Sequence, residues 1–274
     1  MDKSNCMHWT DYFIHLYHIG FRYFQVAGIG FIIFYLLFRR RVSYKKIQLK
    51  FPKNNDYWRE ILFSVITICI FGGVSVLLLK SPLTPYTTLY KNIDDRGWFY
   101  FFAIFPLMFI MHDTYFYWMH RAMHHKKVFR LFHLVHHRST NPSPWAAYAF
   151  HPLEAVVEAG IFPIFLFTLP MHRLHFFLFF FMSIIYNVYG HLGFELYPKS
   201  FSKSRIGKWI NTSVSHNQHH QHFKGNYGLY FLFWDRIMGT LRKDYDEQFA
   251  EVKGRKTVQT MISPVPQESI EVTA

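Results

Sequence analysis

The sequence predicts an all-α integral membrane protein, with four or so transmembrane helices and a helical cap that carries a histidine-rich di-metal site. Apolar residues make up 51% of the 274 residues and only 17% are charged, against roughly 25% charged in an ordinary soluble chain. Several apolar runs approach the length of about 20 residues that a helix needs to cross a bilayer. Fifteen of the 18 histidines fall between His112 and His222. Together these observations favour a membrane protein with a metal site.

Five apolar segments are expected to cross or enter the membrane: residues 19–38, 61–79, 98–111, 153–169 and 174–190. The third segment runs directly into His112 and Asp113, and polar residues at that depth indicate a functional site. The last two segments are separated by Pro170 and are each barely long enough to cross. We expect them to form a helical hairpin that spans the membrane or dips into it.

These segments divide the chain into three regions. Residues 1–97 form an N-terminal transmembrane region with two spans, and residues 98–246 contain the histidine clusters. Residues 247–274 mix charges with Pro264 and Pro266 and have no apolar period. We therefore expect a flexible C-terminal tail.

Lysine and arginine predict the orientation. Eight of them lie between the first two spans, whereas the loop before the third span has few. Because loops rich in these residues stay in the cytoplasm, the third helix returns to the cytoplasmic side at His120. The histidine clusters are then cytoplasmic. The net charge of +13 fits nucleic acid or anionic lipid, and the long apolar runs favour lipid, so no nucleic-acid partner is expected.

The histidines form three clusters with the spacing of metal ligands. Side chains three or four residues apart share one face of a helix, so each cluster directs its imidazoles to one side. One metal ion takes about four to six ligands, so eight histidines exceed one ion and fit two. The predicted ligands are His120, His124, His133, His136, His137, His216, His219 and His220.

The path between clusters adds constraints. His124 and His133 are nine residues apart and would face opposite ways on one straight helix, so the chain must bend between about His125 and Phe129. His151 and His191 each adjoin a helix break, where they serve as further ligands or as helix caps. Asp113 lies on the face of His120, where it holds a ligand imidazole or a backbone group.

The clusters belong to longer motifs. These are Asp113-Thr-Tyr-Phe-Tyr-Trp-Met-His120-Arg121, Ala149-Phe150-His151-Pro152-Leu153-Glu154, and Gly225-Asn226-Tyr227-Gly228 followed by residues 234–240. In this order they resemble the fatty acid hydroxylase and sterol desaturase superfamily of membrane non-haem di-iron enzymes, over residues 98–242. The HxxxH spacing and the phrases YWMHRAMHH and GNYGLYFLFWDR are similar to C-5 sterol desaturases. The HPLE phrase is closer to C-4 methyl sterol oxidases.

The resemblance implies an O₂-dependent oxidoreductase with two iron ions. It makes the eight histidines iron ligands, adds His191, and leaves Asp113, His151 and Glu154 as candidates for holding a ligand. The implied reaction hydroxylates or desaturates an unactivated C–H position of a lipid, most closely a sterol, or of a fatty-acyl lipid. The implied location is the endoplasmic reticulum in a eukaryote or the inner membrane in a bacterium.

Electrons must then come from another protein. The chain has no haem-domain signature, no GxGxxG after a strand and no cysteine cluster. A donor of the cytochrome b5 or ferredoxin type is therefore expected as a partner, besides the lipid substrate.

Two other classes compete with this interpretation. A membrane zinc hydrolase is disfavoured because HExxH is absent and eight histidines exceed an open zinc site of three ligands. A metal transporter or buffer would place polar residues inside several spans, whereas here histidine and aspartate concentrate at one edge. Metal content and O₂ consumption separate the three.

Overall fold

The structure is a computed structural model that describes residues 8–80 and 82–255. Within this part, four helices are long and apolar enough to cross a membrane. The first is α1 (Trp9–Phe31), which a π-helical turn, η2 (Ile32–Leu37), extends; the others are α2 (Asn54–Leu79), α3 (Gly97–Met123) and α8 (Arg173–His191). The predicted fold class, an all-α membrane protein with four spans, is therefore confirmed.

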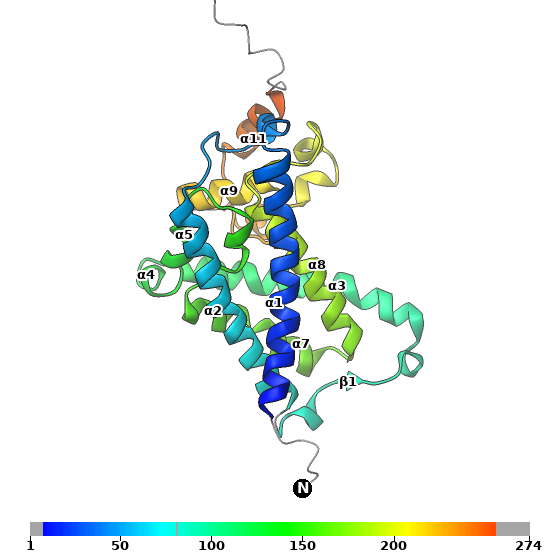
Figure 1. Cartoon of the computed structure of the whole chain (residues 1–274). Helices are drawn as coiled ribbons and strands as arrows, with labels where there is room; N and C mark the ends of the chain where they lie inside the picture. Colours follow the sequence, from blue (N-terminus) through cyan, green and yellow to red (C-terminus); the bar gives the residue numbers. More distant parts are fainter. Residues whose placement is uncertain (1–7, 81, 256–274) are drawn as a thin grey trace, which may run out of the picture.

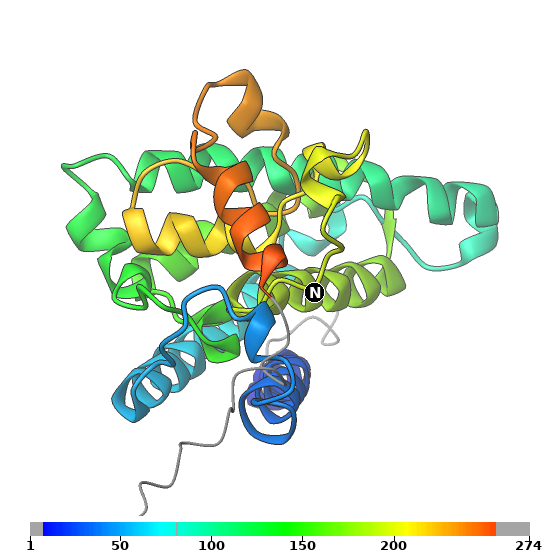
Figure 2. The ribbon, with the colours of Figure 1, turned by 90° about the horizontal axis from the view of Figure 1, so that it is seen from above.

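The long helices form a bundle below a cap of short helices (Figure 1). Helices α1 and α2 lie side by side, while α3 crosses behind them at a steep angle, which Figure 2 shows from above. Tyr23 and Ala27 of α1 pack with Ile68 of α2 and Ile184 of α8 in one buried cluster. At the cap end of the bundle, α9 (Ser213–His222) and α11 (Tyr245–Gly254) lie over the long helices.

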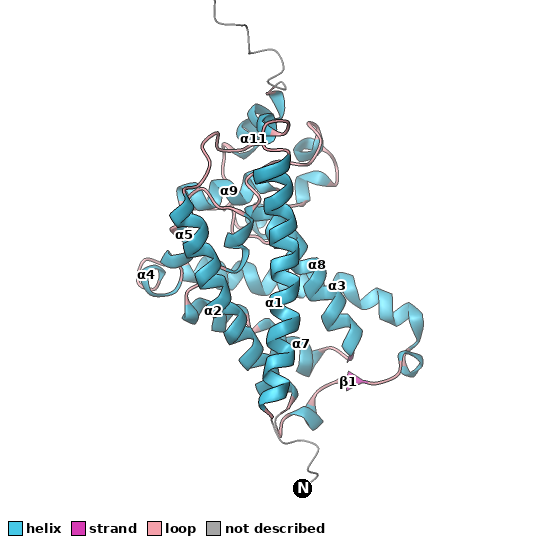
Figure 3. Ribbon diagram, in the orientation of Figure 1, coloured by secondary structure: helices cyan, strands magenta, loops and turns pink. Residues whose placement is uncertain are grey.

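Short elements connect the long helices, and helix dominates throughout (Figure 3). The only strands in the described ranges are β1 (Leu89–Tyr90) and β2 (Met171–His172), which pair in parallel. The short α-helices are α4 (Phe129–Phe132), α5 (Leu134–His137), α6 (Pro152–Glu158), α7 (Ile161–Thr168) and α10 (Phe233–Ile237). The short 3₁₀ helices are η3 (Ser43–Lys45), η4 (Thr84–Tyr86), η5 (Ile93–Asp95), η6 (Pro144–Tyr148), η7 (Phe201–Lys203) and η8 (Gly207–Trp209).

In the predicted hairpin of residues 153–190, only the second half is a helix long enough to cross a membrane. Its second half is α8, but its first half breaks into α6 and α7, neither of which is long enough to cross a membrane. At the break, the carbonyl of Val157 accepts hydrogen bonds from the Tyr115 hydroxyl (2.5 Å) and from the Gly160 amide (2.9 Å). A side chain at residue 160 would collide with that hydroxyl. The sequence cannot reveal this contact from α3.

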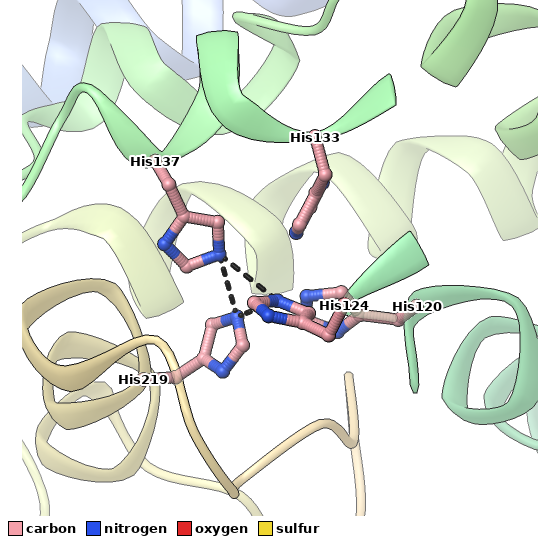
Figure 4. A group of neighbouring side chains, drawn as sticks. All are labelled: His120, His124, His133, His137 and His219. Atoms are coloured by element: carbon pink, nitrogen blue, oxygen red, sulfur yellow. Dashed lines mark hydrogen bonds between the residues drawn. The ribbon is translucent and has the colours of Figure 1, made fainter. Parts of the chain in front are cut away.

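The predicted bend between the first two histidine clusters is confirmed. Helix α3 ends at Met123, a turn follows, and α4 begins at Phe129. Because of this reversal, His133 and His137 face back toward the end of α3 (Figure 4).

The C-terminal region differs from the prediction of a flexible tail from residue 247. Residues 245–254 form α11. Its residues Tyr245, Phe249 and Val252 share one face and pack on Ile47 and Val214 in a buried cluster. Because this apolar face consists of only three residues among charged neighbours, the sequence shows no clear hydrophobic periodicity there. Residues 256–274 lie outside the described part of the chain.

Candidate metal centre

Helix α3 supplies the first two candidate ligands. His120 lies in its last turn and is 1% exposed, and His124 follows directly after the helix at i+4. The Nδ1 atom of His120 donates to the carbonyl oxygen of Tyr227 at 2.9 Å. This bond fixes the ring so that Nε2 faces the centre of the cap.

The second cluster lies on the α4–α5 segment. His133 separates the two short helices, and His136 and His137 belong to α5. His133 Nδ1 contacts the Glu154 carboxylate at 2.6 Å, with both side chains at most 3% exposed. Such a carboxylate orients a metal-binding imidazole and raises its basicity.

The third cluster lies on α9, whose first eight residues are all buried. The Thr212 hydroxyl caps this helix by accepting from the amide of Ser215 at 3.2 Å, as N-cap threonines do. His216, His219 and His220 project from one face of α9, and His219 Nδ1 donates to the carbonyl oxygen of Gly225 at 2.8 Å.

The loop after α9 explains the GNYG motif. Gly225 has a φ of +79°, and a Cβ there would lie 2.5 Å from the carbonyl oxygen of Thr240. This residue must therefore be glycine for its carbonyl to reach His219. Asp235 fixes the rest of the loop by accepting from the amides of Tyr227 and Gly228 at 2.9 and 2.8 Å. The motif was noticed in the sequence, but its role in orienting imidazoles was not predicted.

The ninth histidine, His191, ends α8. Its Nδ1 donates to the carbonyl oxygen of Asn187, one turn earlier in the same helix, at 2.8 Å. Its Nε2 lies 3.0 Å from that of His216 and 3.1 Å from that of His220. Of the two roles left open for His191, its position favours ligation.

The nine histidines converge in two groups. We call His120, His124, His133, His137 and His219 the five-histidine group, and His136, His191, His216 and His220 the four-histidine group. Within each group the potential ligand atoms lie within 4.8 Å of one another. Figure 4 shows the five-histidine group, with rings from three separate stretches of chain turned inward. The groups are adjacent, since the ring centroids of His137 and His220 are 5.0 Å apart.

The arrangement of nitrogens fits metal ions. In the five-histidine group, the Nε2 atoms of His124, His137 and His219 lie 3.0–3.2 Å apart. Because a carbonyl oxygen only accepts, the proton of neutral His219 resides on Nδ1, and its Nε2 presents a lone pair. The Nε2 atoms of His120 and His133 are buried without a hydrogen-bond partner. Buried lone pairs that face one another repel unless a proton or a metal cation lies between them, so this geometry fits a metal site.

The protonation states agree with this. Burial, and then the neighbouring imidazoles, hold the pKa of His216, His219 and His220 well below the usual value. These imidazoles are therefore neutral at physiological pH, which is the form that binds metal.

Three further candidate residues, Asp113, His151 and Glu154, lie outside the two histidine groups. Glu154 contacts His133, as a residue that holds a ligand should. Asp113 instead accepts from the backbone amides of residues 229–231 at 2.7–3.2 Å, so of its two predicted roles the structure supports the backbone one. His151 accepts from the amide of Leu153 at 3.3 Å and caps α6. Neither residue belongs to a histidine group.

Comparison with known proteins agrees with the fold and the motifs. The family model named fatty acid hydroxylase matches residues 105–240. A Delta(7)-sterol 5(6)-desaturase of Gibberella zeae is 30% identical over 233 residues, which cover 81% of this chain and 69% of that protein. A lathosterol oxidase of Mus musculus is 30% identical over 225 residues, covering 79% and 73%. No solved structure matches. The chain therefore belongs to the fatty acid hydroxylase family of oxidoreductases, and among its members it is similar to C-5 sterol desaturases.

Proposed function

We propose that the two histidine groups each hold one iron ion and that the protein oxidises a membrane lipid with O₂. The observation that carries this proposal is the convergence of nine imidazoles in one group of five and one of four, within the family-matched region. Bound there, iron would supply the reduction of O₂ and the cleavage of an unactivated C–H bond, which no side chain can perform.

The protein's own residues would bind the metal ions, orient the imidazoles and exclude water from the centre. Glu154 and the carbonyl groups of Tyr227 and Gly225 hold imidazole N–H groups, so that Nε2 faces inward. Eight of the nine histidines are at most 3% exposed, and exclusion of water protects a reactive centre. The residues we assign as ligands are those of the two groups.

The substrate we propose is a sterol, with a fatty-acyl lipid as the second candidate. Similarity to Delta(7)-sterol 5(6)-desaturases and lathosterol oxidases supports the sterol and favours desaturation over hydroxylation. The balanced desaturation converts a CH–CH unit, O₂, two electrons and two protons into a C=C bond and two waters. The two electrons require a donor, for which we propose an external carrier of the cytochrome b5 or ferredoxin type.

We further infer that the cap faces the cytoplasm and that residues 98–246 form the catalytic region behind an N-terminal transmembrane region of residues 1–97. The run of basic residues between α1 and α2, which includes Arg39, Arg40 and Arg41, supports this orientation. An acidic electron carrier would then meet a positively charged cap surface.

The experiment combines metal analysis with lipid profiling. Purified protein is expected to contain about two iron atoms per chain and to consume O₂ when a reductant and a sterol are present. Deletion in the source organism should change the sterol profile, and wild-type protein, but not His136→Ala, should restore it. Zinc without O₂ uptake, or full rescue by the variant, would refute the proposal in favour of a hydrolase or a metal carrier.

A further inference from the structure

A cavity outside the histidine centre lies among the long helices. It has a volume of about 460 Å³, within the range of roughly 300–1,000 Å³ typical of small-molecule sites. Its walls come mainly from α1, α2, α7 and α8, and they include Glu158 of α6 and Tyr148 of η6. The side chains that line it are mostly apolar and include Ile19, Phe71, Val74, Phe162, Phe176 and Phe180. A rigid apolar ligand of sterol size fits such a space.

One wall of the cavity carries a carboxyl group with no partner. Glu158, the last residue of α6, lines the cavity and is only 9% exposed. Within the described ranges it makes no hydrogen bond and no ion pair, and its carboxyl oxygens are not fully buried, so they are accessible from the cavity. A buried polar group is costly unless something hydrogen-bonds to it. A ligand in the cavity would supply that bond.

The part of the cavity near Glu158 adjoins the metal centre. Glu158 follows one helical turn after Glu154, which holds His133. Tyr148 also lines the cavity, its ring lies 6.3 Å from that of Phe150, and the Phe150 ring lies 5.2 Å from that of His136. One residue thus connects the cavity lining to each histidine group: Phe150 contacts His136, and Glu154, one turn from Glu158, contacts His133.

Three cationic side chains also line the cavity, namely Arg22 of α1, Lys80 and Arg173, and a lipid carboxylate would bind such a group. The guanidinium group of Arg22 already donates to the carbonyl oxygens of His18 at 3.3 Å and Phe177 at 3.5 Å. Arg22 is thus supplied with acceptors, Lys80 pairs with Asp11 at 3.2 Å, and Arg173 is exposed. Glu158, in contrast, is buried and has no partner within the described ranges. This difference favours a ligand with a hydroxyl group over one with a carboxylate.

We propose that the cavity binds the lipid substrate with its hydroxyl end nearest the metal centre, hydrogen-bonded to the Glu158 carboxyl group. This inference rests on the proposed function and deepens it. In a sterol, the carbon that bears the hydroxyl, C3, is two bonds from C5. An enzyme that oxidises C5 must therefore hold the hydroxyl end close to its metals. The alkyl side chain then points away, between α1, α2 and α8.

The test measures binding to the full-length protein as purified, in detergent and without a reductant so that no turnover occurs, with tritiated lathosterol and its 3-deoxy analogue as probes. The wild type should prefer the hydroxylated sterol. Glu158→Leu should weaken lathosterol binding by about tenfold and abolish the preference, because one hydrogen bond to a buried group is lost. Glu158→Gln, which keeps a hydrogen-bonding group, should retain the preference. Val74→Trp, which fills the cavity from α2, should weaken the binding of both probes.

Glu247→Leu is the matched control, since it makes the same change at an exposed glutamate of α11 that does not line the cavity. It should leave the hydroxyl preference intact. An unchanged preference in Glu158→Leu, wild-type binding by Val74→Trp, or displacement of the sterol by palmitate at lower concentrations than by lathosterol itself would each overturn the inference. Metal content and O₂ uptake are measured separately. If iron content and O₂ uptake are as proposed but the preference for the hydroxylated sterol persists in Glu158→Leu, only the inference fails. If sterol binding is as predicted but the purified wild-type protein contains no iron and takes up no O₂, only the proposed function fails.

Discussion

The two histidine groups differ in what holds their imidazoles. In the five-histidine group, a carboxylate holds His133 and carbonyl groups of the loop after α9 hold His120 and His219. In the four-histidine group, His191 is held by a carbonyl of its own helix, the membrane helix α8. Both groups take histidines from a long helix, α3 for the first and α8 for the second. The contacts that orient His120, His133 and His219 come from other segments or loops, whereas the contact that orients His191 lies within its own helix. The groups should therefore respond differently to substitution.

The largest effect is expected from removing one ligand of each group. His136 and His137 are neighbours on α5 but belong to different groups. His136→Ala and His137→Ala should each abolish lipid oxidation and lower the iron content from about two to about one per chain. The ion lost should come from the four-histidine group in the first case and from the five-histidine group in the second. Iron analysis and Mössbauer spectroscopy of both variants check this.

His125→Ala is the control for these variants. His125 adjoins His124 but is exposed and belongs to neither group. Its replacement should leave both ions and the activity in place. Complete loss of both ions from His136→Ala but not from His137→Ala would contradict the division into two separate sites.

A smaller effect is expected from Glu154→Gln. The carboxylate that holds His133 raises the basicity of the imidazole, and loss of such a contact typically lowers metal affinity by about 10–100-fold. One of the two ions should therefore become easier to remove, namely the one in the five-histidine group. Chelator competition followed by iron analysis measures the change. Equal weakening of both ions would show that Glu154 acts on the whole cap.

The sequence predicted which histidines come together better than it predicted the elements that carry them. Histidine spacing is a local property, so three clusters and the bend at residues 125–129 follow from helix periodicity alone. The break at Gly160 and the buried face of α11 depend on contacts with Tyr115 and Ile47, which lie far away in the chain. Periodicity carries no information about such partners.

Sequence periodicity is equally uninformative about the residues that surround the two histidine groups. Depth in the membrane suggested a role for Asp113 near the metals, but the three amides that it binds belong to residues 229–231. The carbonyl groups that orient His120 and His219 are backbone atoms, which leave no trace in residue type. Only Gly225 hints at them, because its backbone conformation excludes a side chain.

A moderate effect on stability is expected in acid for the metal-free protein. The folded state lowers the pKa of His133, His136 and His137, chiefly through burial, while an unfolded histidine titrates near about 6.5. Below that pH the unfolded state binds more protons, so stability falls as the pH falls. Thermal unfolding in detergent should show a midpoint that drops below about pH 6.5, and drops less with iron bound. A midpoint independent of pH from 7 to 5 would contradict neutral, buried imidazoles.

The smallest effect is expected from His151→Ala, which separates a helix cap from a metal ligand. His151 lies in the HPLE motif beside Glu154, yet its Nδ1 accepts only from the amide of Leu153, and its own amide donates to Glu154 at 3.4 Å. Loss of an N-cap side chain costs about 1 kcal/mol, which lowers the unfolding midpoint by about 2–4 °C in a chain of this size. Because the backbone amide remains, Glu154 keeps its position against His133, and the iron content should not change. Loss of an ion from this variant would instead make His151 a tenth ligand and tie α6 directly to the metal centre.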